Sequence, residues 1–131
     1  MTKKELKELY YLQREIRSDE QRLMELESMA TGTTSPANGM LRGGTLSDKT
    51  ALAADIADLK VIIQSKRAMC IALYNKIMRF VACIDDSLMR QIIMHRHLDM
   101  MTWRDIAQKV GGGNSADGIR MMYERFIEKR A

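Results

Sequence analysis

A run of ten evenly spaced residues in the middle of the chain limits the fold more than any other feature. From Leu52 to Ile84 the spacing alternates between four and three residues without a slip, and only Lys66 is not apolar. A repeat of 3.5 residues keeps one side of an α-helix facing a partner helix, as in a coiled coil. The run therefore predicts a single helix of about 50 Å, capped by Ser47 or Asp48. The seam residues are Leu52, Ile56, Leu59, Ile63, Lys66, Cys70, Leu73, Ile77, Phe80 and Ile84.

The N-terminal segment supplies the obvious partner for this seam. Lys3 to Met29 is predicted to form a helix of roughly 40 Å with its own heptad pattern, which Asp19 interrupts once. Because this helix is shorter, the end of the second helix around Leu73 to Ile84 should pack on the C-terminal domain or on a second subunit. The heptad seams therefore also allow a homo-oligomer. The apolar positions of the first helix are Leu9, Leu12, Ile16, Leu23 and Leu26.

A linker is predicted between these two helices, at residues 30–47. It collects glycines, threonines, serines, the only proline and an Asn38-Gly39 turn signal. Such a composition cannot bury enough apolar area to order itself firmly, so disorder is expected ahead of a partner-binding loop. Met40, Leu41 and Leu46 are the residues that would hold part of it down.

The C-terminal third predicts two helices joined by a short turn. Thr102 is the expected cap of the first, because its hydroxyl can accept a hydrogen bond from a first-turn amide. Gly111 should end that helix with a positive φ, and Ser115 should cap the second. The apolar face of the first helix is Trp103, Ile106, Ala107 and Val110, and that of the second is Ile119, Met122 and Phe126.

A further helix is predicted to brace this pair. Asp85 and Asp86 should end or kink the long helix, and either can cap the next one. The expected fold is thus all-α: a long antiparallel coiled-coil hairpin over residues 1–84, then a three-helix helix-turn-helix domain over residues 85–131. A plain packing unit without DNA contact is the alternative for the last three helices. The inner positions are Leu88, Ile92 or Ile93, and His95, with Leu98, Met100 and Met101 in the following corner.

The run from Asp85 to Phe126 resembles region 4 of sigma-70-type factors. It is closer still to small phage transcriptional regulators of the RinA and ArpU kind, whose C-terminal halves share that helix-turn-helix. The resemblance covers about the last third of the chain, and it implies a DNA-binding regulator that also contacts RNA polymerase. The turn from Gly111 to Asn114 is about two residues longer than usual, which leaves the orientation of the second helix open. The matching residues are Arg90, Ile93, Arg96, Leu98, Trp103, Ile106, Ala107, Ser115, Ile119, Arg120, Tyr123 and Arg125.

In a helix-turn-helix the second helix enters the DNA major groove. Arg120 is the best candidate for a bidentate contact with guanine, while Arg104 and Lys109 suit phosphate contacts. Asn114 and Ser115 place polar groups at a helix N-terminus, which is another phosphate site. The competing interpretation is that Arg120 only pairs along its own helix. The residues expected to face outward are Asp117, Gly118, Arg120, Met121, Glu124 and Arg125.

Charge and composition bound the remaining function classes. The net charge of +4 permits nucleic-acid binding, but residues 85–131 contribute only +1 of it. The excess lies upstream and is interpreted as a solvated helix face or, alternatively, as a flank that contacts phosphate or a partner. No segment is apolar enough for a membrane span, and cytoplasmic residence in a bacterial host is the default. The upstream cations are Lys60, Lys66, Arg67, Lys76 and Arg79.

No chemistry-bearing motif is found. Cys70 and Cys83 would lie roughly 20 Å apart on one helix, so they are expected to be free, buried thiols. His95 and His97 are two residues apart and point to nearly opposite sides of a helix, so they cannot bind the same metal ion. The glycine run lacks the Gly-Lys-Ser/Thr sequence of a phosphate-binding loop. An enzyme, a metal site and a cofactor are therefore not expected.

The predicted function is a sequence-specific DNA-binding transcriptional regulator of phage or prophage type, with double-stranded DNA as its partner. Two alternatives remain open. One is a phage DNA-packaging subunit resembling a small terminase, which also joins a helix-turn-helix to a coiled coil. The other is a coiled-coil adaptor that binds only protein.

Overall fold

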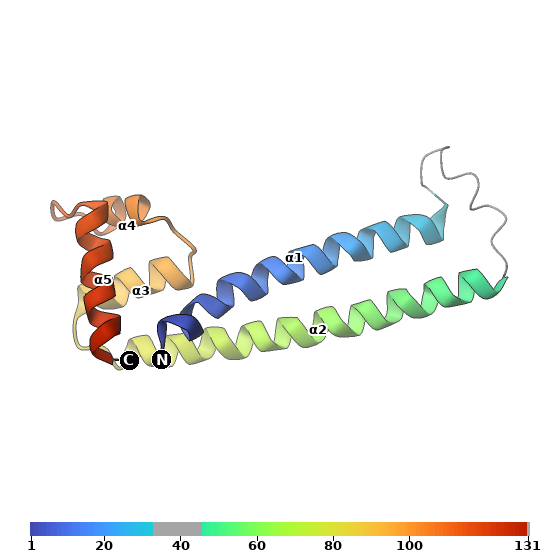
Figure 1. Ribbon diagram of the computed structural model, residues 1–131, viewed down its shortest axis with the longest axis horizontal. Coiled ribbons are helices and arrows are strands. Elements are labelled where there is room, and N and C mark those ends of the chain that lie inside the picture. The colour runs from blue at the N-terminus through green and yellow to red at the C-terminus, as the bar shows by residue number, and fades with distance from the viewer. Residues whose placement is uncertain (33–45, 131) are drawn as a thin grey trace. The chain divides into compact units, whose positions relative to one another are not determined.

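The computed structural model describes residues 1–32 and 46–130, and within these ranges all regular secondary structure is α-helical (Figure 1). This confirms the all-α prediction. The helices are α1 (Lys3–Thr31), α2 (Leu46–Ala82), α3 (Ser87–His97), α4 (Trp103–Val110) and α5 (Ala116–Arg130).

The bounds of α1 and α2 narrow the predicted linker. Helix α1 continues to Thr31, and α2 already begins at Leu46, so Ser47 and Asp48 lie inside its first turn instead of preceding it. Residues 33–45 of the predicted linker, including Met40 and Leu41, lie outside the described residues. None of the described helices is long and apolar enough to cross a membrane.

The described chain divides into two compact units. The first, termed the terminal unit, combines residues 1–13 with residues 70–131. The second, termed the middle unit, is residues 14–69. Both α1 and α2 therefore contribute to both units, and helices α3, α4 and α5 lie wholly in the terminal unit.

In the middle unit, the two residues that interrupt the heptad patterns pair with each other. The Lys66 ammonium lies 2.5 Å from a carboxylate oxygen of Asp19 and 2.8 Å from one of Glu15. Asp19 is otherwise buried beside Ile16, and Ile63 is the buried α2 residue one turn away from Lys66. The polar exceptions in the two seams thus compensate for one another, because each charge finds its partner within the contact between the helices.

The core of the terminal unit gathers residues from all five helices. Leu6 and Leu9 of α1 join Ile77 and Val81 of α2 in one cluster with the buried residues of α3 to α5. The end of the α2 seam is therefore covered within the chain, as expected for packing on the C-terminal domain. The other members of this cluster are Ile84, Met89, Ile92, Ile93, Ile106, Ala107, Ile119, Tyr123 and Ile127.

Helix α3 begins as predicted but buries a different histidine. Asp86 is its N-cap, with the carboxylate accepting a hydrogen bond of 3.1 Å from the Leu88 amide. Both Ile92 and Ile93 are buried, and His97 is buried with them. His95, predicted to face the core, is half-buried: its side chain is 16% exposed, and its ring is paired with the exposed Asp99 at 2.9 Å.

The two cysteines are free thiols, as predicted, but they are not both buried. Cys70 is half-buried in the α2 seam, where burial raises the pKa of its thiol. Cys83 is exposed just after the end of α2. Cys83 lies in the turn between α2 and α3, outside the seam that passes through Phe80 and Ile84.

Candidate nucleic-acid interface

Helix α4 has the cap and the terminator that the sequence predicts. The Asp105 amide donates a hydrogen bond of 3.2 Å to the Thr102 hydroxyl. At the other end Gly111 takes a φ of 66°, and its amide donates to the Ala107 carbonyl at 3.1 Å. Ile106 and Ala107 are the buried residues of this helix, so its inner face lies against α3 and α5.

The turn between α4 and α5 is built from three glycines with positive φ. Gly112 and Gly113 follow Gly111 with φ angles of 70° and 75°, a region that side chains with a Cβ rarely enter. The Asn114 side-chain amide donates to the Gly111 carbonyl at 2.8 Å and closes the turn. The two additional residues are therefore accommodated by left-handed backbone, and the Asn114 side chain is committed to the turn.

Helix α5 starts at a side-chain cap and buries one stripe. The Ser115 hydroxyl accepts from the Gly118 amide at 3.0 Å, as predicted. Ile119 is fully buried, but the stripe continues through Tyr123 and Ile127. Met122 and Phe126, predicted to be its centre, are only half-buried at its edge, because an i, i+4 row and not an i, i+3 row faces α3 and α4.

The outer face of α5 carries most of the residues predicted to face DNA. Arg120 is 48% exposed, and its Nε lies 4.0 Å from the Asp117 carboxylate, at the outer limit of an ion pair. Met121 and Arg125 are exposed as well. Glu124 differs, because both of its carboxylate oxygens lie within 2.8 Å of the Lys3 ammonium of α1. The exposed face therefore consists of Asp117, Arg120, Met121 and Arg125.

The excess positive charge belongs to the terminal unit. Its residues include thirteen Lys or Arg against nine Asp or Glu, whereas the middle unit has eight of each. Arg104 and Lys109, the predicted phosphate contacts, are both exposed on α4. The unit that contains α4 and α5 thus carries the entire net charge of +4.

The upstream cations of α2, interpreted from the sequence as a solvated helix face or alternatively as a flank for phosphate or a partner, are mostly exposed and paired with acids of α1. Lys60 pairs with Glu27 at 3.7 Å, Arg67 with Glu20 at 2.6 Å, and Lys76 with Glu5 at 3.1 Å. Lys66 is held by Glu15 and Asp19 as described above. These cations neutralise the acids of α1, and only Arg79 of the five has no ion pair in the described part of the chain.

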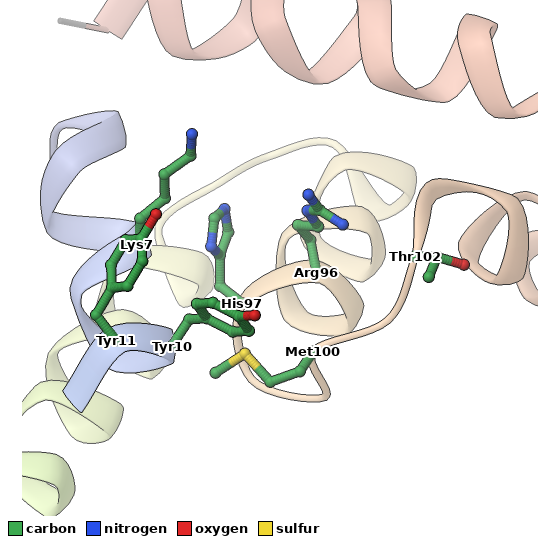
Figure 2. Close-up of a pocket in the computed structure, with 7 residues that line it drawn as sticks. All are labelled: Lys7, Tyr10, Tyr11, Arg96, His97, Met100 and Thr102. Carbon is green, nitrogen blue, oxygen red and sulfur yellow. The ribbon is translucent and has the colours of Figure 1, made fainter. Parts of the chain in front are cut away.

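A pocket of about 360 Å³ lies beside α4 in the terminal unit (Figure 2). Figure 2 shows Lys7 and Arg96 on either side of His97, with their charged groups toward the same side. The Arg96 guanidinium stacks 4.3 Å from the centre of the Trp103 ring and donates to the Met101 carbonyl at 3.0 Å. No carboxylate is among the lining residues, so the pocket favours anions. The lining residues are Lys7, Tyr10, Tyr11, Arg96, His97, Met100 and Thr102.

A buried pair of side chains, His97 and Tyr123, ties this region together. His97 Nε2 lies 2.8 Å from the Tyr123 hydroxyl, and a backbone hydrogen bond links His97 to Leu6. Burial, helped by the Arg96 charge, lowers the pKa of His97 to about 4. Burial also raises the pKa of Tyr123 to about 12, so both groups are neutral at pH 7. No local sequence pattern indicates this pair, because its histidine and tyrosine lie on separate helices.

Comparison with known proteins returns no relative: the chain matches no family model, no curated protein and no solved structure. The proposals below therefore draw on the residues of this chain and their arrangement.

Proposed function

We propose that the last three helices form a helix-turn-helix domain that binds double-stranded DNA sequence-specifically and regulates transcription, in a phage or prophage setting. Helices α1 and α2 form the hairpin that carries this domain. The supporting observation is the α4–α5 unit itself. A capped α4 ends at a left-handed glycine, and a capped α5 follows with its buried stripe inward and a charged face exposed.

In this proposal α5 enters the major groove. Arg120 lies on the exposed face, five residues after the Ser115 cap, and its weak contact with Asp117 leaves the guanidinium available. A bidentate contact with guanine is the commonest specific contact that arginine makes. Arg104 and Lys109 contact phosphates and fix the position of the domain on the duplex.

The concentration of positive charge in the terminal unit supports the same assignment. Each phosphate contact releases counterions, so affinity for any DNA rises with the number of cations at the surface. The middle unit, with its equal numbers of acids and bases, gains nothing from this effect. The resemblance to sigma region 4 adds contact with RNA polymerase to the proposal, through surfaces of the terminal unit that the DNA leaves free.

A protein-binding adaptor is the second candidate function. One observation favours it: exposed Val61, Ile62, Met69 and Ile71 make the outer surface of α2 apolar. Such a surface on a soluble helix marks a contact with another protein chain. An adaptor and a DNA-binding regulator differ in one measurable property, which is affinity for DNA.

The test is a binding titration of the purified full chain on fragments selected from random-sequence DNA, followed at several salt concentrations. The proposal expects a selected motif, with tighter binding to it than to scrambled DNA of equal length. It also expects the logarithm of affinity to fall linearly with the logarithm of salt concentration. Selection without enrichment of any motif would contradict sequence-specific binding. Absence of DNA binding even at low salt would favour the second candidate function, a protein-binding adaptor. Large ring-shaped oligomers would favour the alternative of a phage DNA-packaging subunit.

A further inference from the structure

The face of α2 that is turned away from its buried seam carries a second heptad pattern. Its nine positions alternate at three and four residues, and none of them is charged. Seven are apolar, and all nine are exposed. Val61 and Ile71, the largest β-branched members, are 65% and 64% exposed. This set, termed the outer seam, is Ala54, Ala57, Val61, Gln64, Ala68, Ile71, Asn75, Met78 and Ala82.

The outer seam contrasts with the outward surface of α1. That surface is charged in both signs, with Arg17, Arg22 and Glu25 among its exposed residues. A helix that needs only one covered side shows such a charged face opposite its apolar stripe, as α1 does. Helix α2 is apolar on two sides, which is typical of a helix packed between two neighbours. Within the described part of the chain, α2 has a neighbour only on its inner seam.

We propose that a second copy of this chain covers the outer seam, with the two α2 helices antiparallel and a two-fold axis between Met69 and Cys70. In an antiparallel pair, residues of one heptad class face residues of the other class. With the axis at this point, Val61 faces Met78 and Ala68 faces Ile71 of the second copy. In these layers each larger side chain is placed opposite a smaller one, and towards the ends of the contact Ala57 faces Ala82.

The polar residues of the outer seam agree with the same register. Gln64 faces Asn75 of the second copy, so the only two amides in the seam meet each other and can exchange hydrogen bonds. Sliding one copy by one heptad in either direction would place each amide opposite an apolar residue. A single polar layer of this kind is a known device for fixing the register of a coiled coil.

Charge complementarity selects the antiparallel arrangement over a parallel one. Asp58 and Arg79 flank the outer seam, and neither has an ion pair in the part of the chain that the structure describes. With the proposed axis, Asp58 of each copy lies two residues from the position directly opposite Arg79 of the other copy, on the same side of the seam, within reach of two symmetric ion pairs. In a parallel pair Asp58 would instead lie beside Ala53, which has no charge. The interface between copies is therefore antiparallel, and it exists whether or not the chain binds DNA.

The experiment is sedimentation equilibrium of the full chain without DNA, over a wide range of concentration. The wild type should have twice the mass of one chain. Ile71→Glu should reduce this to one chain while leaving the helical circular-dichroism signal unchanged, because Ile71 is exposed within the single chain. The matched control is Met24→Glu, which changes an equally exposed residue (61%) on the outer surface of α1 and should leave the dimer intact.

Charge exchange tests the register. Asp58→Arg and Arg79→Asp should each weaken the dimer about tenfold or more, because each places like charges opposite one another. The double variant Asp58→Arg/Arg79→Asp should restore most of the loss. A wild type that stays monomeric at high concentration would overturn the proposal, as would a dimer that survives Ile71→Glu. Failure of the double variant to recover would overturn the antiparallel register.

Discussion

His97 is the residue whose placement was hardest to derive from the sequence. Helix α3 has apolar residues at Leu88, Met89, Ile92, Ile93 and Met94, so its apolar positions spread over more than one face. Sequence periodicity alone could not decide which histidine points inward. A distant partner decides it, because His97 Nε2 meets the hydroxyl of Tyr123, which lies on α5. Such long-range pairing leaves no local pattern.

Acid should destabilise the terminal unit through His97. The pKa of His97 is about 4 in the folded chain, against 6.5 for an ordinary histidine in the unfolded chain. Between these two pH values only the unfolded chain binds the proton. Stability is therefore fully present above about pH 6.5 and is lost as the pH falls towards 4, by roughly 2 kcal/mol at pH 5. Urea denaturation at pH 7 and pH 5 measures this difference. His97→Gln should remove most of it, whereas His95→Gln, the matched control on the same helix, should retain it.

At the scale of elements, capping and termination were predictable because they depend on a few neighbouring residues. Thr102, Ser115 and Asp86 all accept the expected backbone hydrogen bonds, and Gly111 takes its positive φ. The buried stripe of α5 was misplaced, because choosing among Met122, Tyr123 and Phe126 requires knowing which helices lie against α5. The tyrosine is buried since its hydroxyl meets His97, a partner that the α5 sequence does not reveal.

The Asp19–Lys66 pair gives a prediction for the contact between α1 and α2. Its hydrogen bonds to Asp19 and then Glu15 raise the pKa of Lys66, so the ammonium stays charged at pH 7. Asp19→Ala should destabilise the chain by about 1–2 kcal/mol, because it leaves Lys66 within the seam with only the more exposed Glu15. Asp19→Leu/Lys66→Leu should recover that loss, since two apolar residues continue both heptad patterns. Urea titration compares the variants; a double variant weaker than Asp19→Ala would contradict this account.

Helix α4 offers a sharper test of the core. Ile106 is fully buried in the terminal unit, so Ile106→Asp would place an unpaired carboxylate there, at a cost of several kcal/mol. We expect the terminal unit to unfold, with a loss of helical circular dichroism and early thermal melting. Gln108→Asp, two residues further along the same helix and exposed, should melt like the wild type. Equal melting of the two variants would mean that the inner face of α4 has been misassigned.

For the whole molecule, the heptad seam of α2 was the most reliable guide. Every seam residue is buried or half-buried, including Ile84 beyond the helix end. The seam spacing could not reveal which acid would pair with Lys66, the one charged residue in the seam. It also could not reveal that residues 1–13 form one compact unit with the C-terminal helices. The second seam on α2 was present in the sequence as well. Its importance emerges only once the first seam is known to be filled by the chain itself, because only then is the outer seam left without a neighbour.

If the chain dimerises through the outer seam and binds DNA through α5, its target should have two-fold symmetry. A symmetric dimer presents two identical reading helices, and palindromic sites mirror that symmetry. The antiparallel register puts the two Ile84 residues, where α2 leads into α3, about 43 Å apart along the α2 axis. Alignment of the fragments recovered by selection should therefore yield an inverted repeat. A single unrepeated motif, bound by one chain, would contradict the combination of the two proposals.

The central claim is that α5 reads DNA, and paired titrations of Arg120→Ala and Lys109→Ala test it most directly. Each variant is titrated on the selected DNA and on scrambled DNA across a salt series. Arg120→Ala should cost about 1–3 kcal/mol on the selected DNA only and relax the preference at one base pair. Lys109→Ala should weaken binding to both DNAs alike and flatten the salt slope by about one. Unchanged affinity of Arg120→Ala for both DNAs would contradict the account, because it would remove α5 from the groove.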